Sequence, residues 1–365
     1  MEIRAAVVRE KGSFVVEAAD LAPPKADEVL VKIVATGLCH TDLAVRDQHI
    51  PLPLPAVLGH EGAGIVAEVG AGVTKVVPGD AVVISYAACG RCANCLSGRP
   101  AYCDQFVAYN VGARRPDGSC THHQNGEPLT SSFFGQSSFG TYALASERSV
   151  VKVPKDIPLD ILGPLGCGIQ TGAGAVLNVL KPKAHESIAV FGLGAVGLSA
   201  VMGAKIIGCA RIVAVDIVES RLNLAKELGA THTVQANKED AVVAVQNLAR
   251  GGVDYAVEAT GIPAVMTQAF DVLKPSGTVV VLGVAPPGAR VSVDASSLLG
   301  GKTIKGAIEG DSIPDIFIPQ LINYYRRGLF PFDRLIRRYK FSEINKAAAD
   351  SERGEAIKPV LMMRD

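Results

Sequence analysis

The sequence of 365 residues predicts an α/β protein with two parts, a β-rich region and a doubly wound parallel sheet. Residues 1 to about 155 consist of short strand-like segments separated by Gly, Pro and Asp turns, with few long helical periods. From about residue 187, buried strand-like segments alternate with helical segments, which is the spacing of right-handed crossovers in a parallel sheet. The chain is long enough for two domains, each with its own core.

The expected elements follow in order. Strands of the first region are expected at 5–10, 28–37, 62–70 and 80–86. Strands of the second region are expected at 187–192, 211–216, 232–236, 253–260 and 277–284, with helices from about 193 to 208 and at 219–230, 239–250 and 264–273. The segment from residue 315 has a helical period again, and "KPVLMM" (358–363) is typical of a strand.

The composition indicates which kinds of binding partner and which cellular compartment to expect. The 36 basic and 36 acidic residues balance, which argues against nucleic acid or an anionic membrane as a partner. The start, "MEIRAAVVRE", lacks the apolar run of a signal peptide, and the glycines and charged flanks of 188–210 favour a buried strand and helix over a membrane span. We therefore expect a cytoplasmic protein, in which eight cysteines indicate metal ligands rather than disulfides.

A glycine-rich loop, "GLGAVG", puts Gly192, Gly194 and Gly197 between a predicted strand and a helix. These glycines allow a tight turn and the close approach of backbone N–H groups to a pyrophosphate. The next strand ends on Asp216, about 20 residues on, where a carboxylate accepts from ribose hydroxyls and repels a 2′-phosphate. The pattern predicts dinucleotide binding and favours NAD over NADP; the alternatives are a packing turn and a helix cap at Asp216.

Four cysteines stand close together in a Gly-rich segment as C-x2-C-x2-C-x7-C. They are Cys89, Cys92, Cys95 and Cys103. Four thiolates can close a tetrahedral shell around zinc with no open position, so the spacing predicts a structural site. A nucleic-acid zinc ribbon would separate two C-x2-C pairs more widely and carry a basic surface, and disulfides are the other alternative.

Cysteines outside this loop are, one by one, more typical of buried small apolar residues than of ligands. Three segments change that when taken together: "GLCHTD" with Cys39, "LGHEG" with His60 and Glu61, and "PLGCG" with Cys167. With the four-cysteine loop and "GLGAVG", they stand in the order found in the zinc-dependent medium-chain alcohol dehydrogenases. The sequence resembles that family over essentially its whole length, and "GLCHTDLAVRD" and "RRPDGS" are most similar to NAD-dependent aryl-alcohol (benzyl alcohol) dehydrogenases.

The resemblance implies a GroES-like catalytic domain, 1–168 completed by 308–365, and a Rossmann NAD-binding domain, 169–307. It implies two zinc ions per chain, and oxidation of a primary, aromatic or allylic alcohol to the aldehyde with hydride transfer to NAD. Relatives are dimers or tetramers that pair through the last strand of the coenzyme domain ("KTIKGAI" here). The long loop from Cys103 to Phe139 resembles that of dimeric members, which favours a homodimer over a tetramer. A general alcohol dehydrogenase or a glutathione-type formaldehyde dehydrogenase is the alternative within the family, and a zinc-free reductase or a non-catalytic zinc protein the alternative outside it.

Individual roles also follow from the resemblance. Cys39, His60 and Cys167 would bind the catalytic zinc, Thr41 would take the alcohol proton, Asp42 would fix the His60 tautomer, and Glu61 would lie behind the metal. The remaining residues that the resemblance assigns are those of the cofactor site, His40, Lys358 and Arg221, and those of the substrate pocket, Ile50, Phe133, Phe134 and Val284.

Two departures from relatives bear on the substrate and on the proton path. Cys120 stands where formaldehyde dehydrogenases carry an Arg, which weakens that alternative. Ala44 stands where liver-type relatives carry a relay His, so we expect the proton to leave to solvent through the nicotinamide ribose, with His49 as the second candidate for its acceptor.

Overall fold

The computed structural model describes residues 1–364 and divides into two compact units. The first unit comprises Met1–Cys167, Ile313–Leu321 and the chain from Asp333 onward, and the second comprises Gly168–Ser312 and Ile322–Phe332. The division expected from the resemblance gave all of 308–365 to the first domain, whereas 308–312 and 322–332 belong to the second unit in the structure.

The first unit is built on two sheets with mostly antiparallel pairing. The five-stranded sheet has the order β4-β1-β2-β7-β8, with β4 (Ala56–Val57), β1 (Glu2–Val8), β2 (Val15–Leu21), β7 (His122–Gln124) and β8 (Glu127–Leu129). The seven-stranded sheet has the order β10-β6-β5-β3-β18-β17, with β9 also paired to β3. Its strands are β10 (Val150–Lys152), β6 (Ala81–Ile84), β5 (Gly62–Val69), β3 (Glu28–Gly37), β18 (Lys358–Met362), β17 (Ile336–Lys340) and β9 (Tyr142–Ser146).

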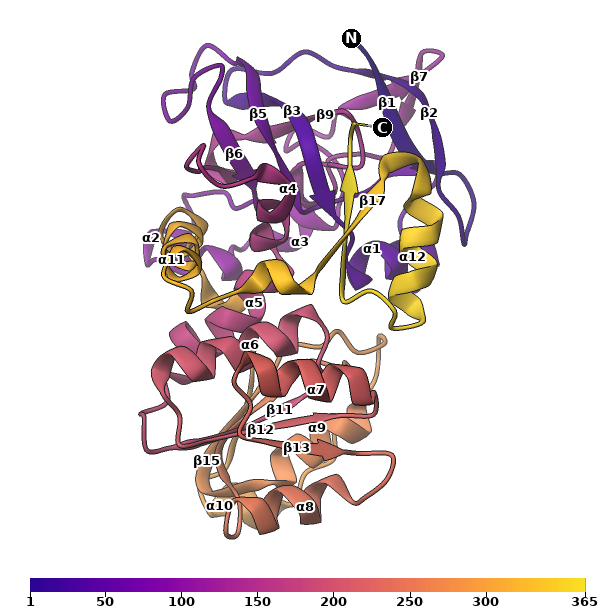
Figure 1. Cartoon of the computed structure of the whole chain (residues 1–365). Coiled ribbons are helices and arrows are strands. Elements are labelled where there is room, and N and C mark those ends of the chain that lie inside the picture. Colours follow the sequence, from indigo (N-terminus) through magenta and orange to yellow (C-terminus); the bar gives the residue numbers. More distant parts are fainter. Residues whose placement is uncertain (365) are drawn as a thin grey trace. The chain divides into compact units, whose positions relative to one another are not determined.

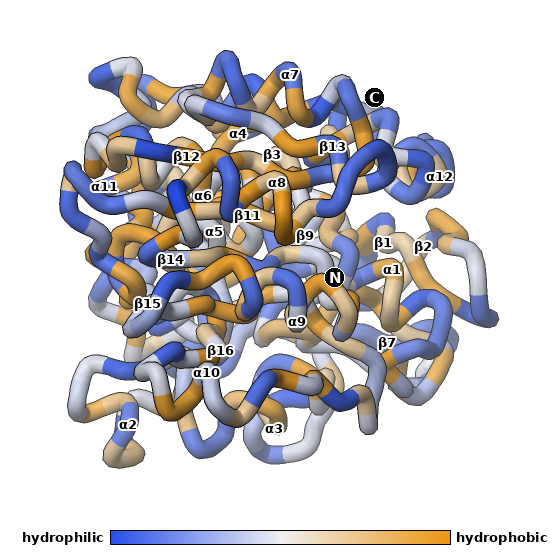
Figure 2. Tube along the Cα trace, turned by 90° about the horizontal axis from the view of Figure 1, so that it is seen from below, coloured by the Kyte–Doolittle hydropathy of each residue, from blue (hydrophilic) through white to orange (hydrophobic). Residues whose placement is uncertain are grey.

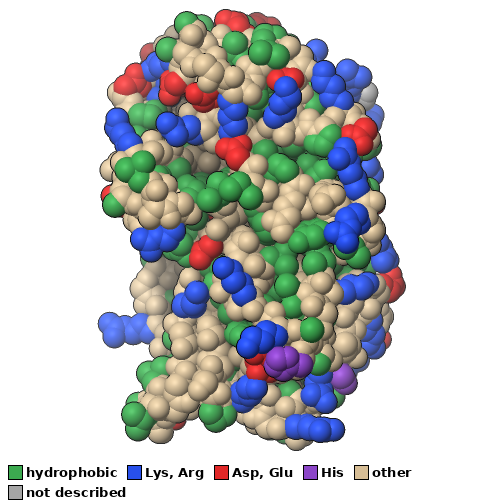
Figure 3. Space-filling view, turned by 90° about the vertical axis from the view of Figure 1, so that its left-hand side faces the viewer, with side chains coloured by type: hydrophobic (Ala, Val, Ile, Leu, Met, Phe, Trp, Pro, Cys, Tyr) green, Lys and Arg blue, Asp and Glu red, His purple; other side chains and the backbone are tan. Residues whose placement is uncertain are grey.

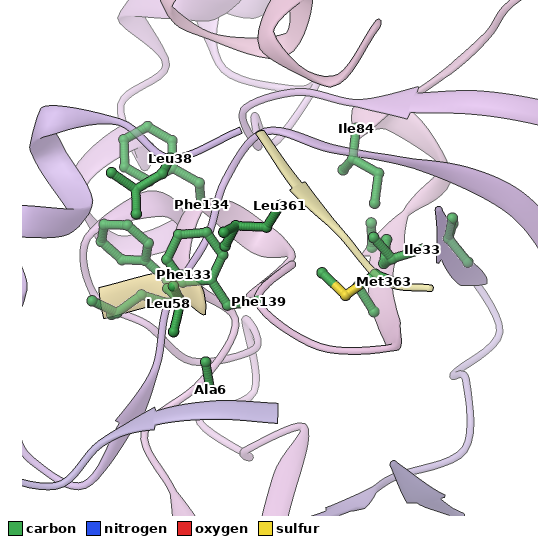
Figure 4. Close-up of a cluster of buried hydrophobic side chains, with 14 of the residues drawn as sticks. Ala6, Ile33, Leu38, Leu58, Ile84, Phe133, Phe134, Phe139, Leu361 and Met363 are labelled. Atoms are coloured by element: carbon green, nitrogen blue, oxygen red, sulfur yellow. The ribbon is translucent and has the colours of Figure 1, made fainter. Parts of the chain in front are cut away.

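Strand β3 organises this sheet because three other strands pair with it. The antiparallel register with β18 sets Val360 opposite Gly37, so the C-terminal strand lies beside the end of β3. The hydrophobic core of the first unit contains Phe133, Phe139 and Leu361, each at most 2 % exposed (Figure 4). Residues far apart in sequence are therefore held together where β3 ends, and the functional site is built at that point.

The second unit contains a six-stranded parallel sheet with the order β13-β12-β11-β14-β15-β16. Its strands are β11 (Ser187–Phe191), β12 (Arg211–Asp216), β13 (His232–Gln235), β14 (Val253–Glu258), β15 (Leu273–Val281) and β16 (Thr303–Gly306). Within this unit, α6 and α7 lie on one face of the sheet and α8 and α9 on the other (Figure 1). The predicted fold class, with its doubly wound parallel sheet, is confirmed.

Helices follow the same division. Those with all residues in the first unit are α1 (His40–Arg46), α2 (Ala93–Leu96), α3 (Phe106–Asn110), α4 (Leu159–Leu162) and α12 (Ile344–Glu352). Those of the second unit are α5 (Gly168–Gly174), α6 (Ala195–Ile207), α7 (Glu219–Leu228), α8 (Ala241–Leu248), α9 (Pro263–Asp271) and α10 (Ala295–Leu299), while α11 (Pro314–Arg326) has residues in both. Surface helices such as α7 alternate hydrophilic and hydrophobic residues along the chain, as one apolar stripe facing a sheet requires (Figure 2).

Two further features of the structure concern the charged side chains on its surface and the length of its apolar helices. Acidic and basic side chains are interspersed on the face drawn in Figure 3. No helix among residues 1–364 is long and apolar enough to span a membrane.

Candidate functional site

The site begins at Asp42 in the first turn of α1. Its Oδ2 accepts from the N–H of Cys39 at 3.0 Å, and its Oδ1 accepts from the N–H of Gly59 at 3.1 Å and lies 2.9 Å from His60 Nδ1. Because a carboxylate can only accept, Nδ1 carries the proton and donates, which leaves the lone pair of the imidazole on Nε2. One fully buried carboxylate thus orients the chain at Cys39 and the ring of His60 together.

Ligand atoms from three separate segments of the chain converge beside it. One atom each from Cys39, His60, Glu61 and Cys167 lies within 4.8 Å of the others. His60 Nε2 is buried and has no hydrogen-bond partner among residues 1–364, so its lone pair is aimed at something other than a protein donor. Two sulfurs and an imidazole nitrogen form the three-ligand set of a catalytic zinc site, and the residues present fit that ion.

The pKa of Cys39 is shifted in the direction that metal binding needs, whereas the pKa of His60 is shifted in the opposite direction. A hydrogen bond from Cys167 holds the pKa of Cys39 well below its usual value, with Lys358 and His60 adding to the effect against the opposing influence of burial. Burial by itself would lower the pKa of His60, but Asp42 and Cys39 together outweigh it and the pKa is raised. A thiolate is the form of cysteine that binds metal.

A buried ion pair lies next to the ligands. Lys358 Nζ contacts both carboxylate oxygens of Glu61 at 2.8 and 3.0 Å, and the two residues are 3 % and 0 % exposed. Burial raises the pKa of Glu61 and opposes the charge on Lys358, whose pKa is nonetheless raised by Glu61. The carboxylate fits only because residue 37 is glycine, since a Cβ there would come within 1.9 Å of Oε2. Lys358, which the resemblance places at the cofactor site with His40, is paired to Glu61, and His40 is exposed.

The residues proposed for proton transfer lie on or just after α1. Thr41 Oγ1 is 3.9 Å from Cys39 Sγ, and its side chain is half-buried. Ala44 is half-buried as well, and His49 is exposed at the surface of the unit. This arrangement leaves a hydroxyl beside the ligand cluster with no imidazole at position 44.

Two of the four predicted pocket residues contact the ligand ring directly. The ring of Phe134 stacks on His60 at 4.5 Å and 25°, and Phe133 meets it edge-on at 5.6 Å. Phe133 is fully buried and Phe134 is 8 % exposed, while Ile50 packs against the same core. Val284 belongs to the second unit, where it is 67 % exposed.

Gln136 is a site residue that the sequence reasoning missed. Its Nε2 donates to the carbonyl of His60 at 3.0 Å, and its Oε1 accepts from the N–H of Gly62 at 3.1 Å. Gln136 thereby fixes the backbone on both sides of Glu61. A polar residue within "FFGQSSFG" is a weak signal, because its burial appears only in the fold.

The four-cysteine loop forms a second cluster in the first unit, with one sulfur from each of Cys89, Cys92, Cys95 and Cys103 within 4.8 Å of the rest. Backbone N–H groups point at the sulfurs, from Cys92 to Cys89 at 3.3 Å and from Cys89 to Cys103 at 3.2 Å. The N–H of Arg91 is the main cause that lowers the pKa of Cys89 to about 6, whereas burial raises that of Cys95 to about 12. Four sulfurs with amide donors fit a closed structural zinc shell.

The phosphate loop of the second unit has the geometry that its three glycines allow. Gly192 has φ +85°, a Cβ on Gly194 would meet nothing within 4 Å, and one on Gly197 would lie 1.8 Å from the carbonyl oxygen of Gly192. The tight turn, the open backbone and the close helix contact are the three uses of glycine in a dinucleotide site.

Asp216 and Arg221 lie at the end of the neighbouring strand and just beyond it. Asp216 accepts from the N–H groups of Leu193 at 2.6 Å and Val218 at 2.9 Å, which joins the acidic residue to the phosphate loop. Arg221 Nε is buried and has no hydrogen-bond partner among residues 1–364. The second unit therefore fits a dinucleotide.

The sequence is similar to those of known proteins over most of its length. Residues 25–155 match the family described as "Alcohol dehydrogenase GroES-like domain", and residues 195–323 match "Zinc-binding dehydrogenase". The sequence is 47 % identical to geraniol dehydrogenase of Castellaniella defragrans over 363 residues, which is 98 % of this chain and 97 % of that protein.

Solved structures agree over the whole chain. A zinc-binding alcohol dehydrogenase domain protein from Burkholderia ambifaria is 54 % identical with a TM-score of 0.98, covering all of both chains. Benzyl alcohol dehydrogenase from Acinetobacter calcoaceticus is 49 % identical with a TM-score of 0.96, covering 99 % of each.

Proposed function

The chain belongs to the zinc-dependent medium-chain alcohol dehydrogenases, and we propose that it oxidises a primary aromatic or allylic alcohol to the aldehyde, with hydride transfer to NAD. The observation that carries this proposal is the convergence of Cys39, His60 and Cys167 around the free lone pair of His60 Nε2. The homologues named for geraniol and benzyl alcohol act on substrates with unsaturation next to the carbinol carbon, which agrees with the substrate class.

Cys39, His60 and Cys167 would hold the catalytic zinc, which supplies Lewis acidity toward the alcohol oxygen when bound. Asp42 keeps the proton of His60 on Nδ1, so that Nε2 stays available as a ligand. The carboxylate of Glu61 lies behind the ligands, and the ammonium group of Lys358 neutralises its charge there.

Thr41 is the group that takes the proton of the alcohol. Its hydroxyl lies next to the ligand Cys39, and a hydroxyl can accept one proton while passing on its own. With Ala44 in place of an imidazole, position 44 offers no proton acceptor, so the proton would pass from Thr41 toward solvent, and the exposed His49 is the second candidate acceptor. Thr41→Ala should lower kcat by orders of magnitude, Thr41→Ser should retain most of it, and His49→Ala should change it only a few-fold.

Phe133 and Phe134 support an apolar substrate. Their rings pack on His60, so they would lie beside an alcohol whose oxygen approaches the same ligand cluster. Because each buried CH₂ contributes about 0.8 kcal/mol, ethanol should be a poorer substrate than benzyl alcohol mainly in kcat/KM.

Asp216 supports NAD as the cofactor. It is 8 % exposed and already bonded to Leu193, so a 2′-phosphate beside it would meet a fixed negative charge. Asp216→Ala should raise the KM for NAD and relax discrimination against NADP. A wild-type enzyme that prefers NADP would contradict this assignment.

The edge strand β16 supports association as a homodimer. It closes one side of the parallel sheet and exposes Thr303, Lys305 and Gly306. An unpaired strand edge offers N–H and C=O groups to a second copy. Light scattering on the purified protein should give the mass of two chains.

The deciding experiment follows absorbance at 340 nm with NAD and a panel of benzyl alcohol, geraniol and ethanol. The proposal expects turnover of the first two with a much lower kcat/KM for ethanol, and loss of turnover in Cys39→Ala with NAD binding retained. Ethanol performing as well as benzyl alcohol would reduce the proposal to a general alcohol dehydrogenase. No turnover of any alcohol would overturn it.

A further inference from the structure

A buried carboxylate lies in the second unit with no role in the chemistry described so far. Glu258 is the last residue of β14 and is 0 % exposed. Its donors are all neutral: Oε1 accepts from the N–H of Thr260 at 2.6 Å, from the Thr260 hydroxyl, and from the N–H of Gly261 at 3.2 Å. Among residues 1–364 it forms no ion pair with Lys or Arg, so burial raises its pKa. A buried acid without a cation is costly to keep, which calls for an explanation.

The position of Glu258 in the sheet suggests one. In the order β13-β12-β11-β14-β15-β16, the chain winds outward in one direction from β11 and in the other from β14. Open parallel sheets bind ligands outside the carboxyl ends of their strands at such a switch point. Glu258 ends β14 there, directly beside Phe191 of β11, which leads into the phosphate loop.

The turn that Glu258 holds, residues 259–261, packs against two loops at this edge. On one side, a Cβ at Gly192 would lie 2.6 Å from Cγ2 of Thr260, so the methyl group rests on the first glycine of the phosphate loop. On the other side, a Cβ at Gly261 would lie 2.6 Å from the carbonyl oxygen of Val284. The N–H of Ala259 also donates to the carbonyl of Phe191 at 2.9 Å. The turn therefore lies between the loop that follows β11 and the loop that follows β15, and it contacts both.

We infer that Glu258 is a positioning residue for the dinucleotide: its carboxylate locks the 259–261 turn against Gly192 and so sets the crevice that receives the cofactor. The inference rests on the proposed binding of NAD at the phosphate loop. Glu258 acts through the turn and not by touching the cofactor. Because its donors are neutral and lie mainly on Oε1, with the Gly261 N–H shared with Oε2 at 3.4 Å, the role requires an acceptor and not a charge.

The test measures the Kd of NADH by fluorescence titration in three variants and the wild type. Glu258→Ala removes the acceptor and should raise Kd by at least about tenfold, the equivalent of 1.4 kcal/mol. Glu258→Gln keeps one carbonyl oxygen and should stay within about threefold of the wild type. Asp254→Ala is the matched control, since Asp254 lies on the same strand, away from the switch point, and accepts from the N–H of Ser187 at 2.9 Å. It should lower the thermal midpoint and leave Kd unchanged.

A merely structural role would move the thermal midpoint and not the Kd of the folded protein. If Glu258→Ala binds NADH as the Asp254→Ala control does, or if Glu258→Gln loses as much affinity as Glu258→Ala, the inference is wrong. Should Glu258→Ala fail to fold, Thr260→Val removes the hydroxyl donor while keeping a methyl group on Gly192, and an unchanged Kd in that variant would also overturn it. A wild-type protein that binds no NADH would instead refute the proposed function.

Discussion

Asp42→Asn tests the link between the carboxylate and the ligand cluster most directly. The carboxylate makes three contacts, two through Oδ1, with Gly59 N–H and His60 Nδ1, and one through Oδ2, with Cys39 N–H. Asparagine has the same shape but only one accepting oxygen. If that oxygen takes the place of Oδ1, the amide NH₂ faces the N–H of Cys39, and if it takes the place of Oδ2, the amide faces both His60 and Gly59. At least one buried donor therefore loses its partner.

The expected size of the effect comes from two independent estimates. A buried donor left without an acceptor costs about 1–3 kcal/mol. Loss of a hydrogen-bonded partner of a ligating histidine typically costs about 10–100-fold in metal affinity, or roughly 1.4–2.7 kcal/mol. We therefore expect Asp42→Asn to weaken zinc binding at the Cys39 cluster by about 10–100-fold while the four-cysteine cluster keeps its ion.

The assay titrates the purified protein with a chromophoric chelator and counts the zinc retained per chain. Asp42→Asn should lose one zinc at a chelator concentration at which the wild type retains both. Asp294→Asn is the control, since this exposed N-cap of α10 accepts from the N–H of Ser297 at 2.7 Å and lies in the second unit. If Asp42→Asn kept its zinc as tightly as the control, the role given to the carboxylate would be wrong.

Three further predictions concern stability. Cys103→Ala should release one zinc and lower the thermal midpoint, because a closed structural shell contributes folding free energy; unchanged zinc content would contradict this. Arg115→Ala should lower the free energy of unfolding measured in urea by about 3–5 kcal/mol, because Arg115 donates twice to the buried Glu28 at 2.7 Å. Lys346→Ala, which removes an exposed ion pair, should lower it by at most about 1 kcal/mol. Equal losses in these two variants would refute that contrast. Burial lowers the pKa of His122 from 6.5 to about 3, so as the pH falls His122 takes up a proton in the unfolded chain before it does so in the folded protein. The free energy of unfolding therefore decreases below pH 6.5, by up to about 1.4 kcal/mol per pH unit. In thermal melts from pH 7 to 5, His122→Gln should lose less stability than the wild type, and an identical loss would count against this cause.

Several elements of the second unit could be predicted closely because their strands are short apolar runs bounded by glycine or charge, although β15 begins at Leu273 and not at 277, and α10 was not expected. The strand expected at 211–216 is β12, Arg211–Asp216, and the helix expected at 219–230 is α7, Glu219–Leu228. Binary pattern and turn residues determine such elements locally, so no knowledge of distant contacts is needed.

The candidate site could not be derived in this way. Cys39, His60 and Cys167 are separated by up to 128 residues, and only the resemblance to a family linked them before the fold brought their ligand atoms together. The pair of Lys358 and Glu61 depends on the register of β18 against β3, and Gln136 depends on a loop folding back on β5. Local sequence carries no information on such registers, because they are set by packing between distant segments.

Charge at the ligand cluster supports a divalent cation independently of the ligand pattern. Asp42 and Glu61 are both 0 % exposed and lie beside two cysteine sulfurs, while Lys358 supplies one buried positive charge. Burying uncompensated anions costs several kcal/mol each, so the cluster needs further positive charge in its interior. A zinc ion held by both sulfurs and Nε2 would supply that charge, which would account for the burial of two carboxylates so close to the ligands.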